Sequence, residues 1–279
     1  MKNEKIFSIV LTALFTAIII IMAETPLGYL PLGVINATLL HIPVILGALF
    51  LGPKKGAFLG FVFGLTSFLN NTLKAATASA FVFSPVLAYN VDGIAGVFKS
   101  IYICFIPRIL VGIVPYYVYL LVRSITRGDN KVGKIVADII AAVIILFSVR
   151  AILLKNSVAN IPATLIGVAV AIVLFVVLFI TLRAKSSQTI SYAYAGIFGA
   201  FTNTFFVMSG IYILYKAAYA EATGVAGDAV LDIILSVITV NGVMEAGIAA
   251  ILVAAVSTAL AHLKPVYADR KEIAKVLEN

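Results

Sequence analysis

Residues 36–71 read NATLLHIPVILGALFLGPKKGAFLGFVFGLTSFLNN. This stretch predicts two membrane-spanning helices joined by a tight basic turn, Gly-Pro-Lys-Lys, at residues 52–55. In the second helix Gly56, Gly60 and Gly64 recur every fourth residue, so they line one helix face and leave a smooth backbone surface. Small residues in this arrangement let another helix approach very closely inside a membrane. We therefore expect helical membrane architecture, with the two lysines of the turn facing the cytoplasm.

The composition of the whole chain supports this prediction. Hydrophobic residues make up 62% of the 279 residues, charged residues make up 11%, and the mean hydropathy is +1.13. These values exclude a soluble globular domain, and the apolar runs are long enough for helices but do not alternate as the strands of a barrel would. The single cysteine, Cys104, excludes an internal disulfide framework. The first apolar run reaches Met22 without a cleavage motif, so we expect a retained first helix.

The apolar runs predict an all-α integral membrane protein with eight spans. We place these spans at residues 6–23, 35–52, 54–72, 98–123, 132–154, 160–183, 189–215 and 229–261. If the N-terminus is inside, most lysines and arginines fall in the inner segments, and the outer segments hold only Lys74, Lys99, Lys155 and Lys216. This bias predicts a protein of the cell membrane with both termini in the cytoplasm. It also accounts for the net charge of +8 without a nucleic-acid partner.

Motifs for several kinds of chemistry are missing from the sequence. There is no GxxxxGK[ST] phosphate loop, no HExxH and no GxSxG, so we expect neither ATP hydrolysis by this chain nor an enzyme of another class. The two histidines, His41 and His262, fall on different predicted helices, which argues against a metal site. We expect no cofactor.

Polar residues inside the spans are costly in a membrane and call for a reason. Counted inward from the outer surface, Arg108, Asn203 and Asn241 reach similar depths, and Glu245 lies one turn deeper on the face of Asn241. An arginine there suits a carboxylate ligand, because its planar fork donates two parallel hydrogen bonds. The alternative is structural: an ion pair between Arg108 and Glu245, with the two asparagines bridging helices.

Two predicted outer connections are candidate lids over a ligand. Residues 24–34 are rich in proline and glycine and carry Tyr29, and residues 73–97 form the longest connection and carry Tyr89. The predicted ligand-binding residues are therefore Arg108, Asn203, Asn241, Tyr29, Asn71, Tyr89 and Glu245. On the first helix, Ala13 and Ala17 form a small flat patch among bulky residues.

Several segments resemble one family, the substrate-binding S components of energy-coupling factor (ECF) vitamin transporters, and most closely the pantothenate type. The matching pieces are Ala13-x-x-x-Ala17, PLGYLPLG at 26–33, residues 36–68 of the stretch above, ATASAFVFSP at 76–85, FIPRILVGIVPY at 105–116, GAFTNTFFV at 199–207 and VNGVMEAGIAAIL at 240–252. The resemblance implies that the chain binds a vitamin on the outside of the membrane. It also implies that the chain hands this vitamin to a module of one transmembrane T component and two ABC-type ATPase subunits. In this family the matching alanine patch contacts the T component, which gives Ala13 and Ala17 that role.

The chain departs from the family in its number of spans, because the family fold has six. The extra pair of predicted spans falls within residues 128–185. We expect a single membrane domain over residues 1–279, with a family core at 1–127 and 186–279 and an inserted transmembrane hairpin at 128–185. Three alternatives stay open: an S component for another vitamin such as riboflavin, a stand-alone ion-coupled secondary carrier using Glu245 or Asp138, and a membrane enzyme.

Overall fold

The basic turn of the 36–71 stretch forms as expected in the computed structural model. Gly52 has a φ of +84°, a left-handed conformation that glycine adopts without strain, and it ends helix α2 (His41–Leu51). Pro53 begins helix α3 (Pro53–Leu73), at the position where its missing N–H costs no hydrogen bond. The two apolar helices therefore form a tight hairpin, which the sequence predicted.

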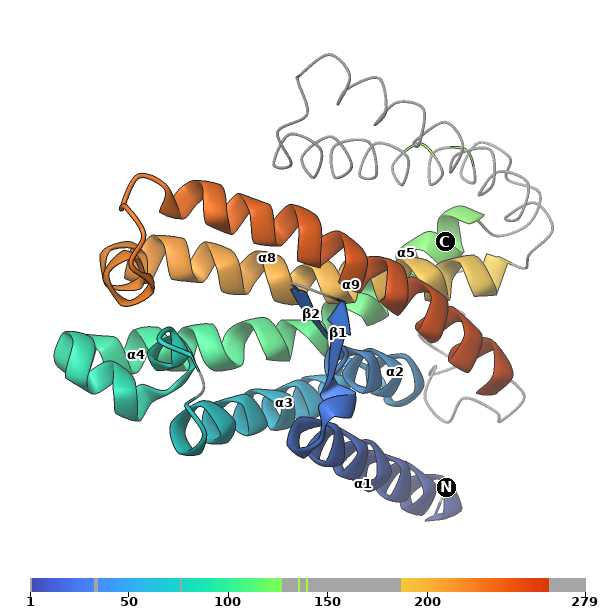
Figure 1. Cartoon of the computed structure of the whole chain (residues 1–279). Coiled ribbons are helices and arrows are strands. Elements are labelled where there is room, and N and C mark those ends of the chain that lie inside the picture. Colours follow the sequence, from blue (N-terminus) through green and yellow to red (C-terminus); the bar gives the residue numbers. More distant parts are fainter. Residues whose placement is uncertain are drawn as a thin grey trace.

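The structure describes residues 2–32, 35–75, 77–126 and 187–260, together with the single positions 135 and 139 (Figure 1). The remaining elements, in chain order, are α1 (Lys2–Glu24), the 3-10 turn η1 (Pro26–Gly28), strands β1 (Tyr29–Leu32) and β2 (Ile35–Thr38), the 3-10 turn η2 (Ala80–Phe83), and helices α4 (Pro85–Val111), α5 (Val114–Thr126), α8 (Ser187–Thr223) and α9 (Val230–Leu260). The predicted spans 132–154 and 160–183 lie outside the described residues.

The predicted span at 35–52 is corrected by the structure. Its first four residues form β2, which pairs antiparallel with β1 so that Tyr29 faces Thr38, and the helix begins only at His41. The remaining helix of 11 residues rises roughly 16 Å, about half of the hydrocarbon thickness. Figure 1 shows the β1–β2 hairpin extending from the end of α1 towards α8 and α9, and β2 contacts α9.

The predicted span at 98–123 is also corrected. Helix α4 begins earlier, at Pro85, and contains a break at Asp92 and Gly93, so half of the predicted connection 73–97 is helical. The helix ends at Val111, and α5 begins at Val114 after a turn. Pro115 explains this boundary, because it has no N–H to donate to the carbonyl of Val111 and so cannot extend α4.

Five helical segments of the described part are long and apolar enough to cross a membrane. They are Lys5–Glu24, Pro53–Leu73, Pro85–Thr126, Gln188–Thr223 and Val230–Leu260. The described part is therefore helical apart from the short β1–β2 hairpin, which agrees with the predicted class of fold. We call the end of the bundle that holds this hairpin and η2 the hairpin end, and the opposite end, at Gly52 and Pro53, the turn end.

Gly56, Gly60 and Gly64 form a glycine ridge along α3, which packs against the backbone of α4. The sequence predicted such a close approach of another helix. A side chain at Gly56 would strike the carbonyl of Gly112, and one at Gly60 would strike the carbonyl of Arg108. A Cβ at Gly64 would lie 3.1 Å from the carbonyl oxygen of Cys104. The two helices thus meet backbone to backbone, and Gly60 lies directly beside the buried arginine.

Candidate ligand-binding site

Helices α8 and α9 run antiparallel in a register that two contacts define. At the turn end the hydroxyls of Thr189 and Thr258 lie 3.4 Å apart. Further along, a Cβ at Gly196 would lie 2.5 Å from the carbonyl oxygen of Ala249. This register brings Asn203 beside the part of α9 that carries Asn241 and Glu245.

Two more contacts bring α4 and α2 to the same level. A Cβ at Gly210 of α8 would lie 3.0 Å from the side chain of Ile103, so Arg108, further along α4, lies across from the α8 turn that holds Asn203. A Cβ at Gly199 would lie 2.5 Å from the side chain of Ile45. Helix α2 runs away from the hairpin end and α8 runs towards it. One turn nearer the hairpin end than the Ile45–Gly199 contact, His41 and Asn203 therefore lie at the same level. Four helices therefore carry polar groups at one level, which we call the polar level.

Arg108 is buried, with 6% of its surface exposed, and its conformation follows from the residue before it. Pro107 lies inside α4 and has no N–H, so the carbonyl of Ile103 loses its usual partner one turn back. The guanidinium turns back along its own helix, and its Nη1 donates to that carbonyl at 2.7 Å. Its carbon Cζ lies 5.5 Å from the ring centre of Phe63 and 4.9 Å from that of Phe83. The charge is thus held about one turn towards the hairpin end from the polar level, beneath η2.

Glu245 is buried, with 4% of its surface exposed, and ties three elements together. One carboxylate oxygen accepts a hydrogen bond from the backbone N–H of Thr38 at 2.8 Å, and the other accepts one from the hydroxyl of Thr204 at 2.7 Å. The carboxylate therefore fastens the end of β2 to α8 and α9.

The two asparagines of the site differ in burial. Asn203 is buried, with 8% exposed, and among the described residues its Oδ1 has no hydrogen-bond partner. Asn241 is half-buried on α9. For Tyr29 the structure describes the backbone, which pairs with Thr38, and not the side chain.

Two of the predicted ligand-binding residues are not brought to the polar level. Asn71 lies about three turns from Gly60 towards the hairpin end, and its Nδ2 donates to the carbonyl of Ser67 in its own helix at 2.8 Å. Tyr89 is 58% exposed and precedes the break in α4. Both residues lie at the hairpin end, where a lid would be.

Sequence reasoning missed His41, which it considered only as a metal ligand. The ring is fully buried, and neither of its nitrogens has a hydrogen-bond partner among the described residues. A polar ring at the start of the apolar run IPVILGALFL is the signal that could have drawn attention to it. Among the described residues there is also no cluster of metal-ligating side chains.

A separate groove of about 610 Å³ lies between α4 and α8. Its described lining is mainly aromatic and aliphatic and includes Phe98, Tyr102, Phe206 and Ile213, of which Phe98 and Ile213 are about 70% exposed. None of the predicted ligand-binding residues is among the residues that line it. The polar level, and not this apolar groove, is therefore the candidate binding site.

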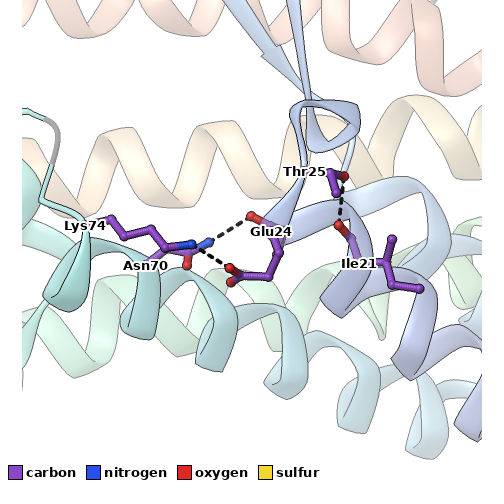
Figure 2. Close-up of polar contacts among 6 residues, drawn as sticks. Ile21, Glu24, Thr25, Asn70 and Lys74 are labelled. Atoms are coloured by element: carbon purple, nitrogen blue, oxygen red, sulfur yellow. Dashed lines mark hydrogen bonds and ion pairs between the residues drawn. The ribbon is translucent and has the colours of Figure 1, made fainter.

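Helix α1 presents the patch that the sequence singled out. Ala13 and Ala17 are exposed, whereas Phe15 and Ile19, on the opposite face, are buried. Figure 2 shows how the far end of α1 is fastened to α3. Lys74 forms an ion pair with Glu24 at 2.5 Å, and the Nδ2 of Asn70 donates to the carbonyl of Ala23 at 2.9 Å. The alanine patch is thus left uncovered by the described residues.

These features define a multi-pass helical membrane protein with a buried polar site beneath a short hairpin. The family described as "ECF transporter, substrate-specific component" matches residues 7–155, which is more than half of the chain. The chain belongs to this family, and it is accordingly a transport component and not an enzyme. The match ends inside the segment that we assigned to an inserted hairpin.

Two characterised relatives are similar to part of the chain. The pantothenic acid transporter PanT of Lactococcus lactis subsp. cremoris is 40% identical over 136 residues, which cover 48% of this chain and 65% of that protein. The pantothenate transporter PanT of Leuconostoc mesenteroides subsp. mesenteroides is 32% identical over 121 residues, which cover 41% of this chain and 51% of that protein. The chain therefore matches between half and two thirds of the length of these relatives.

Proposed function

We propose that this protein is the vitamin-binding subunit of an ATP-driven ECF importer and that its vitamin is pantothenate. The names of the two relatives favour this vitamin. The observation that carries the proposal is the buried Arg108, which stands beneath η2 close to a level of uncharged polar groups. Pantothenate carries one carboxylate together with an amide and two hydroxyls, so its charge and its uncharged groups match the two parts of this site.

Each predicted site residue has a role in this proposal. Arg108 holds the carboxylate, because a charge-assisted contact from a planar guanidinium is strong inside a protein. Asn203 and Asn241 supply hydrogen bonds to the amide and hydroxyl groups. Tyr29, Asn71 and Tyr89 belong to the segments that close over the ligand. Glu245 acts at the inner side of the site, where it also holds the end of β2.

The partners and the orientation follow from the same proposal. The chain hands its vitamin to a T component and two ATPase subunits, and the T component docks on Ala13 and Ala17. The hairpin end faces the outside, and both termini lie in the cytoplasm. The chain then crosses the bilayer eight times, and residues 128–185 add a transmembrane hairpin to a six-helix family core.

The test is a binding measurement on the purified chain in detergent, without partners or ATP. We expect calorimetry against a panel of vitamins to show tight binding of pantothenate and none of riboflavin. Tight binding of riboflavin and not of pantothenate would show that the vitamin is riboflavin. Uptake that depends on an ion gradient and not on ATP would favour a secondary carrier. A chain that binds no vitamin contradicts the proposal.

The first variant to measure is Arg108→Ala. Its removal leaves a desolvated carboxylate without a partner, so affinity for pantothenate should fall by about 2–5 kcal/mol, roughly thirtyfold or more. Arg108→Lys should recover only part of this loss, because an ammonium group lacks the planar fork. Arg123→Ala, near the turn end of α5, is a control for the loss of one positive charge. An Arg108→Ala protein with a normal melting temperature and normal affinity for pantothenate would show that Arg108 is not a ligand-binding residue.

A further inference from the structure

His41 is the polar side chain of the bundle that the proposed function leaves unused. The imidazole is fully buried at the first residue of α2, and among the described residues neither ring nitrogen has a hydrogen-bond partner. Buried polar groups in native proteins are nearly always paired, since leaving one unpaired costs its full desolvation. An imidazole kept in this state calls for a partner that the described part of the chain does not supply.

A second buried group that finds no partner within the described ranges lies on a neighbouring helix. The Oδ1 of Asn203 is buried, and α2 contacts α8. The contact between Ile45 and Gly199, one turn away from both residues, puts His41 and Asn203 at the same level. These two buried groups lie on helices in contact, each lacks a partner in the described part of the chain, and together they point to one ligand that satisfies both.

The position of His41 is fixed from the side of α9 as well. Thr38, three residues before it, donates its backbone N–H to the buried carboxylate of Glu245. This bond joins the end of β2 to α9, and α2 also contacts α9 (Figure 1). The start of α2, which carries His41, is therefore anchored against both α8 and α9.

We propose that His41 is a ligand-binding residue of the polar level, where its imidazole and the Oδ1 of Asn203 together bind the hydroxyl and amide groups of the ligand. A neutral imidazole offers one donor and one acceptor, and the Oδ1 of an asparagine accepts, so the ligand supplies at least one O–H or N–H. This inference rests on the proposed function and adds an orientation to it. The carboxylate of pantothenate points to the hairpin end and Arg108, and its dihydroxy end points inward to His41.

The test compares folding and binding in His41→Leu. Because leucine removes a buried polar group that has no partner among the described residues, the ligand-free protein should melt at the same temperature as wild type or higher. Its affinity for pantothenate should fall at least tenfold. His41→Gln, which offers a donor and an acceptor, should recover part of the affinity. Ser257→Ala is a matched control, because that hydroxyl is also buried without a partner among the described residues but lies about three turns further from the hairpin end than Glu245. It should leave affinity unchanged.

A direct readout is available because the chain has only two histidines. In a His262→Gln protein with ¹⁵N-labelled histidine, the imidazole nitrogen resonances report on His41 alone, and pantothenate should shift them. Unchanged resonances, wild-type affinity of His41→Leu, or a His41→Leu protein that no longer folds would each overturn the inference. If the wild-type chain binds another vitamin of the panel, the vitamin assignment fails and the same comparisons with that vitamin test His41. Binding of no vitamin overturns both proposals.

Discussion

At the scale of the residue, the central feature of the site is the pair Pro107 and Arg108. The proline removes one backbone donor, and the arginine that follows it returns a donor to the same carbonyl, that of Ile103. The charge is therefore anchored to its own helix and lies against the rings of Phe63 and Phe83. An arginine held in this way would lose little side-chain freedom on binding a ligand.

Gly60 supports this arrangement, because no side chain fits between it and the carbonyl of Arg108. Gly60→Ala should push α3 and α4 apart, destabilise the protein by about 1–3 kcal/mol and weaken pantothenate binding. Gly247→Ala is the matched control: it lies in α9 with nothing within 4 Å of the added Cβ, so alanine should be neutral or stabilise by up to about 1 kcal/mol. Melting temperature and calorimetry on both proteins check this, and a Gly60→Ala protein as stable as the control would contradict it.

The sequence could predict some of these residues and not others. The common level of Arg108, Asn203 and Asn241 follows from counting residues along helices, because each residue adds a fixed rise. Two features depend on contacts between segments far apart in the chain: the role of Glu245 as an anchor for Thr38, and the lack of a partner for His41 among the residues that the structure describes. No count along the sequence reveals such contacts.

At the scale of the element, the errors of the sequence analysis fell at helix ends. Residues 35–38, which read INAT, lead into the apolar run of α2 without a glycine or proline between them, yet they form β2, and so short a segment does not distinguish a strand from a helix. The break between α4 and α5 was missed although Gly112 and Pro115 marked it. The α2–α3 turn and the glycine ridge of α3 were predicted, because glycine and proline act there through local geometry.

Helix α1 carries the prediction that belongs to this scale. Ala13→Trp and Ala17→Trp should each abolish co-purification with a T component and vitamin uptake, because an indole ring prevents close approach of another helix. Pantothenate binding by the isolated chain should persist, since the polar level is built from other helices. Leu14→Trp, at an exposed position about 100° from Ala13 and about 60° from Ala17 around the helix, should disturb docking less. Loss of pantothenate binding in the alanine variants would show instead that α1 belongs to the ligand site.

At the scale of the whole molecule, composition and charge bias were sufficient to predict a multi-pass helical membrane protein. The number of spans does not follow from composition and charge alone, and the segment 128–185, which holds two of the eight predicted spans, lies almost wholly outside the described residues. We predict that this segment is dispensable for binding, since the polar level is formed by α2, α4, α8 and α9. A deletion variant that joins Arg127 to Ser187 through a short flexible linker should insert, keep its C-terminus in the cytoplasm and bind pantothenate.

A reporter fused to the C-terminus that is active only in the cytoplasm, together with calorimetry, checks both parts of this prediction. An active reporter without binding would show that the deleted segment contributes to the site. An inactive reporter would show that the segment crosses the membrane an odd number of times.

The backbone contact between α3 and α4 has a consequence for how such a protein can change over generations. The spacing of the two helices is set by glycines against main-chain carbonyls, and every amino acid has that carbonyl. The side chain at position 108 is therefore not needed to keep the helices together. If Arg108 holds the ligand as proposed, a substitution there would alter which molecule is recognised while the scaffold stays the same, and a lineage of these proteins could exchange one nutrient for another without first rebuilding its fold.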